Sequence, residues 1–192
     1  MKNNKKFIAI TTAGLSLAAY IILASITGNL LPVSDGAYSQ WTPSSGTTHY
    51  TMVDEATCNG TTDYNYTSTV NNRDSYGVDI SSISNGSTIT KIEITPCASK
   101  NSNGGSNSTM NVFYRYNGSN SADAGSYSLS GTTPTQLAST SFSGLSLIKG
   151  DSSTLEIGTV LSAGTKGAKL GQIKTVITYT PLSAPTNLDA TN

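Results

Sequence analysis

The side chain best suited to proton transfer near neutral pH is histidine, and this chain contains one, His49. A Ser-His-Asp triad would have to use it, and the G-x-S-x-G turn of many hydrolases is absent from the sequence. One histidine and two cysteines cannot form a zinc site of the Cys/His type, and no P-loop or G-x-G-x-x-G turn occurs. We therefore predict that the chain is not an enzyme and that His49 is structural.

Carboxylates are concentrated between positions 54 and 79, where Arg73 is the only cation. They are Asp54, Glu55, Asp63, Asp74 and Asp79. Loops of a β-sandwich can gather such oxygens around Ca²⁺, which takes about six to eight oxygen ligands, although no EF-hand spacing is present. Asp54 and Asp74 are the candidate ligands, and calcium is the only cofactor considered. The alternative is that these carboxylates are solvated and that one pairs with Arg73.

Aromatic residues could bind a ligand, because exposed Tyr and Trp rings stack on sugars. The chain has ten Tyr and one Trp against three Phe. Trp41, Tyr114 and Tyr116 are the candidates for such a surface. Tyr114 and Tyr116 share one face of a predicted strand, so a core or cross-strand role is the competing interpretation, and Trp41 can equally be a core residue.

Residues 1–32 predict export. Lys2, Lys5 and Lys6 precede a run without charged residues from Phe7 to Ser34. A positive start followed by an apolar run is the pattern of a secretory signal, with a weak cleavage site at Ser25-Ile26-Thr27. The run is also long enough, at about 20 residues, to anchor the chain in a bilayer as one hydrophobic helix. Both alternatives predict an extracellular or cell-surface location, with membrane contact only through this segment.

Export bears on Cys58 and Cys97, which are the only cysteines. A cysteine pair in an exported chain is most simply a disulfide. It would close a loop of about 40 residues and contribute roughly 4 kcal/mol in the chain-entropy model. Both cysteines lie at predicted strand ends, where a bridge could join two edges.

The composition excludes several classes of protein. Ser, Thr, Asn and Gly number 29, 28, 16 and 18, while charged residues make up 11% and the net charge is zero. A coiled coil requires a chain rich in Ala, Glu, Lys and Leu, and a nucleic-acid binder usually carries excess basic charge. A neutral, hydroxyl-rich chain is typical of an extracellular β protein. Its expected partners are surface glycans or other surface proteins.

Apolar residues in the exported part alternate with polar ones in short runs separated by turn residues. The predicted strands are 49–55, 64–70, 75–81, 90–94, 110–116, 127–130, 136–142, 155–161 and 172–179. Asn85-Gly86 and Asn117-Gly118 are turn dipeptides, and the segment 162–171 looks like a hairpin turn. Many short strands indicate an all-β antiparallel two-sheet sandwich of jelly-roll type over residues 33–182, with an immunoglobulin-type sandwich as the alternative.

Five segments carry a resemblance to a known kind of module. They are SDGAYSQWTPSSGTTHYTMVDE, DYNYTSTVNNRDSYGVDI, KIEITPCASK, MNVFYRYNG and LEIGTVLSAGTKGAKLGQIKTVITYTPL. Together they resemble an uncharacterised jelly-roll-like β-sandwich module of large bacterial cell-surface proteins, over Ser34 to Leu182. Residues 183–192, SAPTNLDATN, resemble the first strand of a fibronectin type III domain or a linker to one. The resemblance implies a fold and a location, and it transfers no functional residues.

These observations favour a non-enzymatic, exported surface module that displays, spaces or adheres. One alternative is a carbohydrate-binding module that uses exposed Tyr or Trp. Another is a subunit of an extracellular filament, in which Leu30–Gln40 would be donated to the open sheet edge of a neighbour.

Overall fold

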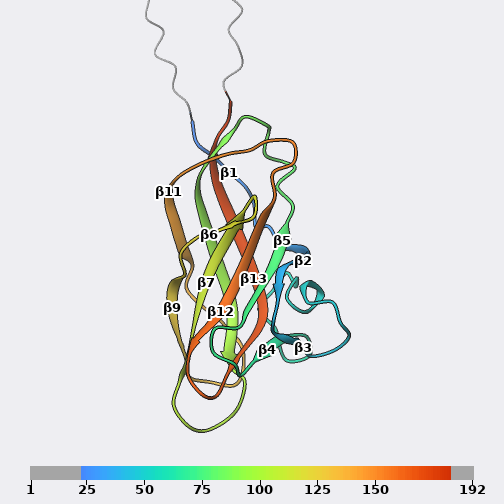
Figure 1. Ribbon diagram of the computed structural model, residues 1–192, viewed down its shortest axis with the longest axis vertical. Helices are drawn as coiled ribbons and strands as arrows, with labels where there is room; N and C mark the ends of the chain where they lie inside the picture. Colours follow the sequence, from blue (N-terminus) through green and yellow to red (C-terminus); the bar gives the residue numbers. More distant parts are fainter. Residues whose placement is uncertain (1–22, 183–192) are drawn as a thin grey trace, which may run out of the picture.

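The computed structural model describes residues 23–182, which form two packed antiparallel β-sheets (Figure 1). The predicted all-β two-sheet sandwich is therefore confirmed. Positions 1–22 of the predicted N-terminal helix lie outside the described residues. The segment 183–192 also lies outside them. Within residues 23–182, no helix is long and apolar enough to cross a membrane.

The elements, in chain order, are β1 (Ser25–Ile26), β2 (Pro32–Ser39), β3 (Thr42–Pro43), the 3₁₀-helix η1 (Tyr50–Met52), β4 (Asn65–Thr67), β5 (Arg73–Val78), β6 (Thr88–Lys100), β7 (Ser108–Tyr116), β8 (Ser119–Asn120), β9 (Ala124–Leu129), β10 (Thr135–Gln136), β11 (Thr140–Ile148), β12 (Leu155–Ala163) and β13 (Ala168–Thr180).

The chain repeatedly crosses between the two sheets. One sheet has the order β10-β6-β13-β4-β3, with β11 also on β6 and β1 also on β13. The other has the order β2-β5-β12-β7-β8, with β9 also on β7. Since β12 and β13 belong to different sheets, the predicted hairpin turn within 162–171 is wrong. Its residues 164–167 form an arch between the sheets, and a hairpin and an arch both use glycine at positive φ, as Gly164 and Gly167 have here.

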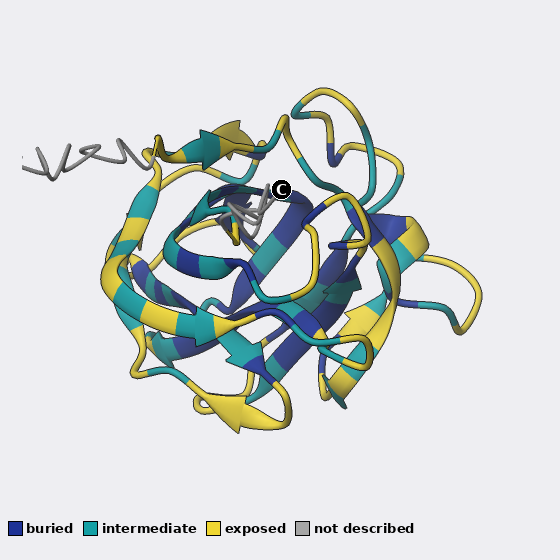
Figure 2. Ribbon diagram, turned by 90° about the horizontal axis from the view of Figure 1, so that it is seen from above, coloured by how far each residue is buried: buried dark blue, intermediate teal, exposed yellow. Residues whose placement is uncertain are grey.

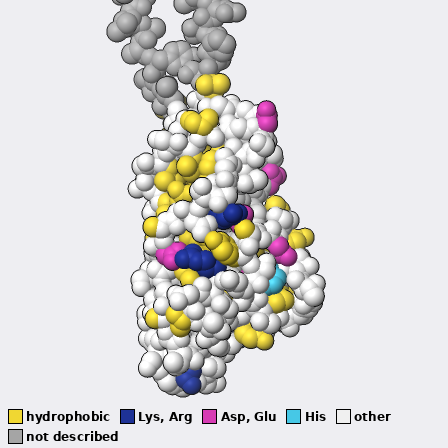
Figure 3. Space-filling view, viewed as in Figure 1, with side chains coloured by type: hydrophobic (Ala, Val, Ile, Leu, Met, Phe, Trp, Pro, Cys, Tyr) yellow, Lys and Arg dark blue, Asp and Glu magenta, His cyan; other side chains and the backbone are white. Residues whose placement is uncertain are grey.

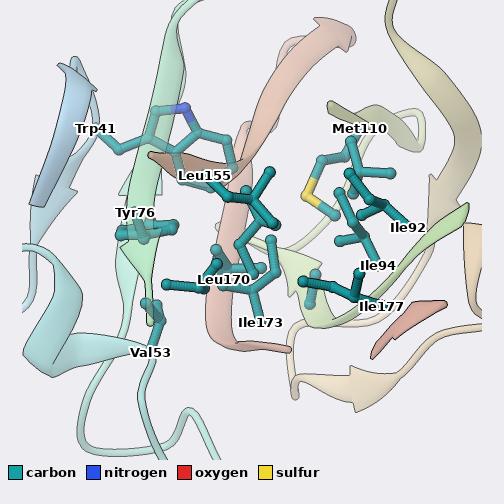
Figure 4. Close-up of a cluster of buried hydrophobic side chains, with 14 of the residues drawn as sticks. Trp41, Val53, Tyr76, Ile92, Ile94, Met110, Leu155, Leu170, Ile173 and Ile177 are labelled. Carbon is teal, nitrogen blue, oxygen red and sulfur yellow. The ribbon is translucent and has the colours of Figure 1, made fainter. Parts of the chain in front are cut away.

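The core follows the two-residue period of the long strands, because successive side chains point to opposite faces. Ile92 and Ile94 of β6, Met110 of β7, and Ile173 and Ile177 of β13 are all fully buried (Figure 4). Burying one such side chain is worth about 1.5–3 kcal/mol. Viewed down the long axis, the buried positions lie between the layers and the exposed ones on the outer strands and loops (Figure 2).

The outer face of the second sheet has its own aromatic packing. Gly158 of β12 is paired with Phe113 of β7, and a Cβ on Gly158 would lie 2.6 Å from the Phe113 ring. The missing side chain makes room for the ring on the sheet. The Arg73 guanidinium then lies 4.8 Å from the ring centroid and is paired with Asp123 at 2.7 Å.

Both described ends of the chain lie at one end of the elongated sandwich, named here the junction end (Figure 1). Ser25 is paired with Tyr179, so the first and last strands are neighbours. The opposite, far end carries the loops 101–107, 131–134 and 164–167. The first loop contacts the third, because Asn101 N–H donates to Gly167 O at 3.4 Å, and Lys100 at the end of β6 donates its N–H to Gly131 O of the second loop at 2.7 Å.

Two strand predictions fail near the start of the domain. The predicted strand 49–55 instead contains η1, because the N–H groups of His49 and Tyr50 both donate to Asp35 Oδ1, at 2.9 and 2.7 Å. A single carboxylate that binds two successive N–H groups favours a turn over a ladder. Strand β2 was not predicted, because its sequence PVSDGAYS shows no apolar alternation.

Candidate functional site

A buried cluster of polar side chains, His49, Asp74, Tyr76 and Asn65, lies where η1 packs against β4 and β5. His49 Nδ1 is 2.9 Å from Asp74 Oδ2, and the Tyr76 hydroxyl donates to the same oxygen at 2.9 Å. Asn65 Nδ2 donates to the Tyr76 hydroxyl at 3.0 Å and to His49 O at 2.8 Å. Asp74, Tyr76 and Asn65 are completely buried, and His49 is 8% exposed.

The backbone explains how four residues from three segments of the chain meet. Asp74 and Tyr76 are two positions apart on β5 and therefore point to the same face. Asn65 lies on β4 of the other sheet, and the Asp35 carboxylate holds the backbone of His49 at the start of η1. The cluster thus joins both sheets to the irregular segment that follows β3.

The electrostatics order the hydrogen atoms within the cluster. Burial raises the pKa of Asp74 above its ordinary value, and the hydrogen bond from His49 opposes part of the rise. Burial also raises the pKa of Tyr76 well above its ordinary value, and the nearby Asp74 adds to the rise. Tyr76 therefore stays protonated and donates to Asp74, which leaves its own oxygen to accept from Asn65.

A histidine held through Nδ1 by a carboxylate has the orientation found in hydrolase triads, with Nε2 turned toward a nucleophile. Within residues 23–182, the only side-chain hydrogen bond of the His49 ring is the one to Asp74. No Ser, Thr or Cys side chain of this part of the chain is hydrogen-bonded to the ring. The arrangement is suited to holding η1 in place.

The two calcium candidates do not come together as a site. The Asp74 carboxylate is occupied by His49, Tyr76 and the Trp41 N–H, which lies 3.4 Å from Oδ1. Asp54 is partly exposed on the loop after η1. Across the described residues, no group of three or more His, Cys, Asp or Glu is arranged to hold a metal ion.

The aromatic candidates are mainly core residues. Trp41 is 3% exposed, and its Nε1 donates to Asn72 O at 3.0 Å. Tyr116 is 8% exposed, and its hydroxyl donates to Ile148 O at 2.7 Å. Tyr114 is half-buried and meets Phe142 edge-on, with the ring centroids 5.1 Å apart.

A different aromatic pair lies on the outer face of the first sheet. Tyr64 and Tyr66 are partly exposed, with ring centroids 6.0 Å apart. The Lys169 amine lies 4.3 Å from the Tyr64 ring centroid. The alternating pattern of the segment 64–70 placed both tyrosines on one face, which was the sequence signal that could have identified this pair.

The predicted Cys58–Cys97 disulfide is confirmed, with a Cα–Cα distance of 5.5 Å. It fastens the loop after η1 to β6. Beside it the loop lies tightly on β13, since a Cβ on Gly171 would come within 2.3 Å of Gly60 Cα. Glu55 lies in the same loop, and burial raises its pKa to about 6, with the charges of Asp54 and Asp63 contributing.

A cleft of about 410 Å³ opens beside β2 and β5 toward the junction end. Its charged lining residues are Asp35, Asp79, Lys149, Asp151 and Glu156. Several of these are committed to structural bonds. Asp35 binds the η1 backbone, and Glu156 accepts from the Ala37 N–H and the Ser75 hydroxyl and pairs with Arg115 at 2.8 Å.

Fold and site together define a disulfide-bonded, all-β two-sheet sandwich with a buried polar cluster. No protein-family model matches the sequence, and no curated protein matches it. Among solved structures, the chain is similar to dimeric latent PorU from Porphyromonas gingivalis, with a TM-score of 0.43 and 14% identity. The match covers 90% of this chain and 14% of the PorU chain, and at this TM-score it carries no functional argument.

Proposed function

We propose that the chain is an exported, non-enzymatic cell-surface module that displays a binding surface at its far end. The observation that carries this proposal is the position of both described chain ends at the junction end (Figure 1). A spacer in a linear array needs its chain to enter and leave at opposite ends. A domain with adjacent ends projects sideways from whatever carries it, which favours display or adhesion over spacing.

The far end has the properties of a presented surface. Its loop 101–107 is almost entirely exposed and consists of Asn, Ser and Gly, with Gly104 and Gly105 at positive φ. Loops mounted on a rigid scaffold are frequent binding sites. The amide and hydroxyl groups here offer neutral hydrogen bonds, and Lys166 adds one cation. Such chemistry suits glycans or the polar surfaces of other proteins.

The test is to replace residues 101–107 by a Gly-Ser sequence of equal length and to measure adhesion of beads coated with the full chain. The surfaces offered to these beads should be coated in turn with glycans, with host proteins and with the chain itself. We expect the replacement to reduce adhesion at least tenfold. The matched control changes Ser82 and Ser84 to Gly in an exposed loop at the junction end and should leave adhesion unchanged. Equal loss in both variants would contradict the proposal.

The sequence resemblance supports the same proposal at finer detail. It implies a jelly-roll-like module of a bacterial surface protein, exported by its N-terminal segment and placed ahead of a fibronectin type III domain. Digestion of intact cells with protease should degrade the module if it is displayed outside. Sequence beyond Asn192 that continues a fibronectin repeat would support the predicted arrangement.

A second candidate function is carbohydrate binding, favoured by the partly exposed pair Tyr64 and Tyr66. Two rings and a nearby lysine on one face can stack on a sugar and bind its hydroxyls. A glycan array should show hits that Tyr64→Ala and Tyr66→Ala abolish and that Tyr50→Ala, a half-buried tyrosine elsewhere, retains. EDTA should leave binding unchanged, and an array without hits would remove this candidate.

Filament assembly by strand donation has less support. The proposed donor, Leu30–Gln40, contains β2, which is paired with β5 of its own chain. Donation would first require this pairing to break.

A further inference from the structure

Most of the large exposed hydrophobic side chains gather at the junction end. Of the six in residues 23–182, four form what we name the apolar rim: Leu23, Ile26, Ile148 and Leu182, which are 76%, 67%, 58% and 66% exposed. Hydrophobic side chains are visible at this end of the molecule (Figure 3). Single exposed hydrophobic residues are common, whereas a group rimmed by polar residues marks an interaction surface.

The strand pairing places the rim residues across the end of one sheet. Ile148 is paired with Thr88, and Thr88 with Thr180. Strand β1, which carries Ile26, lies on the other side of β13. Neighbouring strands are about 4.8 Å apart, so these side chains lie within a few strand spacings of one another.

Leu182 lies between the end of β13 and Ile148. A Cβ on Gly86 would lie 2.8 Å from Leu182 Cδ2, and the Gly86 N–H donates to Lys149 O at 2.7 Å. Leu182 therefore lies beside the residue that follows Ile148.

The sequence next to the rim points to what covers it. Residues 7 to 24 include no charged residue, and β1 begins at Ser25. A membrane span requires about 17–25 predominantly apolar residues, so this run of eighteen positions would be used almost completely to cross a bilayer. Hardly any chain would then be left as a spacer, and the junction end would have to lie directly on the membrane surface.

We propose that the run 7–24, which ends beside the rim at Leu23, stays attached as a membrane anchor and that the other rim residues, Ile26, Ile148 and Leu182, rest on the lipid surface. This inference relies on export of the sandwich, which is part of the proposed function. Apolar side chains at the headgroup boundary are stabilised by leaving water. Membrane contact then extends beyond the N-terminal segment to the folded domain.

Retention of the anchor also preserves β1. The Thr27 N–H donates to Ile177 O at 3.0 Å, and the Ile177 N–H donates to Thr27 Oγ1 at 3.0 Å. Cleavage after Thr27 would remove these bonds together with two rim residues, Leu23 and Ile26. It would leave the last residues of β13, beyond the Leu30–Thr175 bridge, unpaired on this edge, and unpaired sheet edges favour aggregation.

The test places the full chain in phosphatidylcholine vesicles that contain a lipid-borne fluorescence quencher. A fluorophore is attached at Ile148→Cys, at Leu182→Cys or, as the control, at Val70→Cys. Val70 is 42% exposed and adjoins Asn71, whose N–H donates to Leu161 O. Leu161 lies six residues along β12 from Leu155 at the start of the strand, which is about 20 Å. Val70 is therefore far from the junction end, which makes it a suitable control.

We expect quenching at positions 148 and 182 to exceed quenching at position 70 several-fold. Equal, weak quenching at all three positions in membrane-bound chain would overturn the proposal. So would a cell-derived protein whose first residue is Gly28. Energy transfer between labels at position 148 that persists when lipid is added in excess would identify a second copy as the occupant and would overturn the proposal.

The far-end loop replacement can be measured on the same vesicles. Loss of specific adhesion with quenching intact leaves both proposals standing. If the loop replacement leaves adhesion unchanged and quenching is intact, the proposed function is contradicted while the proposed lipid contact stands. The two proposals can therefore fail separately.

Discussion

The irregular segment Thr42–Asp63 and four of the long strands, β6, β7, β12 and β13, are held in place by different means. The strands combine continuous antiparallel ladders with apolar side chains that are fully buried. The segment has the two-residue strand β3 and the short helix η1. Its attachments are discrete: the buried polar cluster, the Cys58–Cys97 disulfide and the close contact of Gly60 with Gly171.

This difference indicates where each part of the molecule is vulnerable. Apolar packing is distributed, so a truncated side chain lowers the stability of the whole domain while the remaining contacts persist. A discrete attachment is lost as a whole when one of its groups is removed, because a buried donor that loses its acceptor retains its full desolvation cost. The following predictions compare the two regions by global stability and by local proteolysis.

The largest effect is expected from replacing both Cys58 and Cys97 by Ala. The disulfide joins residues separated by 39 positions, and its loss should lower the free energy of unfolding by about 4 kcal/mol. Urea unfolding measures this change, and limited proteolysis should find new cleavage between residues 54 and 63. A loss below about 1 kcal/mol would show that the other attachments suffice.

Ile94→Ala tests the long strands. Ile94 is fully buried in β6, so removing most of its side chain should cost about 3 kcal/mol, and Ile94→Val should cost about 1 kcal/mol. Below the unfolding transition, proteolysis within residues 42–63 should not increase. Selective cleavage there would mean that the two regions are not separable.

Asp74→Ala removes the carboxylate that accepts from His49, Tyr76 and the Trp41 N–H, which leaves three buried donors without their bonds. We expect a loss of about 2 kcal/mol, accompanied by faster proteolysis near η1. Asp74→Asn keeps one acceptor oxygen and should lose about half as much. Equal losses in the two variants would show that the carboxylate charge, and not its hydrogen bonds, holds the cluster.

The smallest effect is expected from Glu55→Gln. The pKa of Glu55 in the folded chain, about 6, lies above its ordinary value of 4.5, so the folded state binds the proton more tightly than the unfolded state. Wild-type stability should therefore fall as pH rises from about 4.5 to about 6, and the glutamine variant should avoid this loss. Because the side chain is partly solvated, we expect a gain of only about 1 kcal/mol at pH 7 and none below about pH 4. Unfolding at several pH values measures it, and parallel pH profiles would contradict it.

Much of the sandwich could be predicted from sequence because apolar and polar residues largely alternate along its long strands. The segments 110–116 and 172–179 were identified by that period and lie within β7 and β13. Strand β2 lacks the signal, since an edge strand with irregular register has little apolar surface to bury. The residues that form η1 contain suitable apolar types, but a carboxylate fourteen positions away from His49 determines their backbone.

The polar cluster was beyond sequence reasoning for a related reason. Asp74 and Tyr76 have the spacing of one strand face, but His49 and Asn65 join them only through the packing of the two sheets. Asp74 was instead considered as a calcium ligand, because an isolated carboxylate in a sequence does not show its partners. The disulfide was easier to predict, since only one pairing of two cysteines within a chain exists.

The adjacent ends of the chain also determine how tension passes through this protein. Where the polypeptide continues on both sides, a pulling force enters at Leu23 and leaves at Leu182, and it acts first on the pairing of β1 with β13. When two antiparallel strands are pulled apart from the same end, their hydrogen bonds break one after another and not all at once. The part of the sandwich between Thr175 and the far end bears no force during this step. The far end therefore keeps its structure while the junction end unfolds.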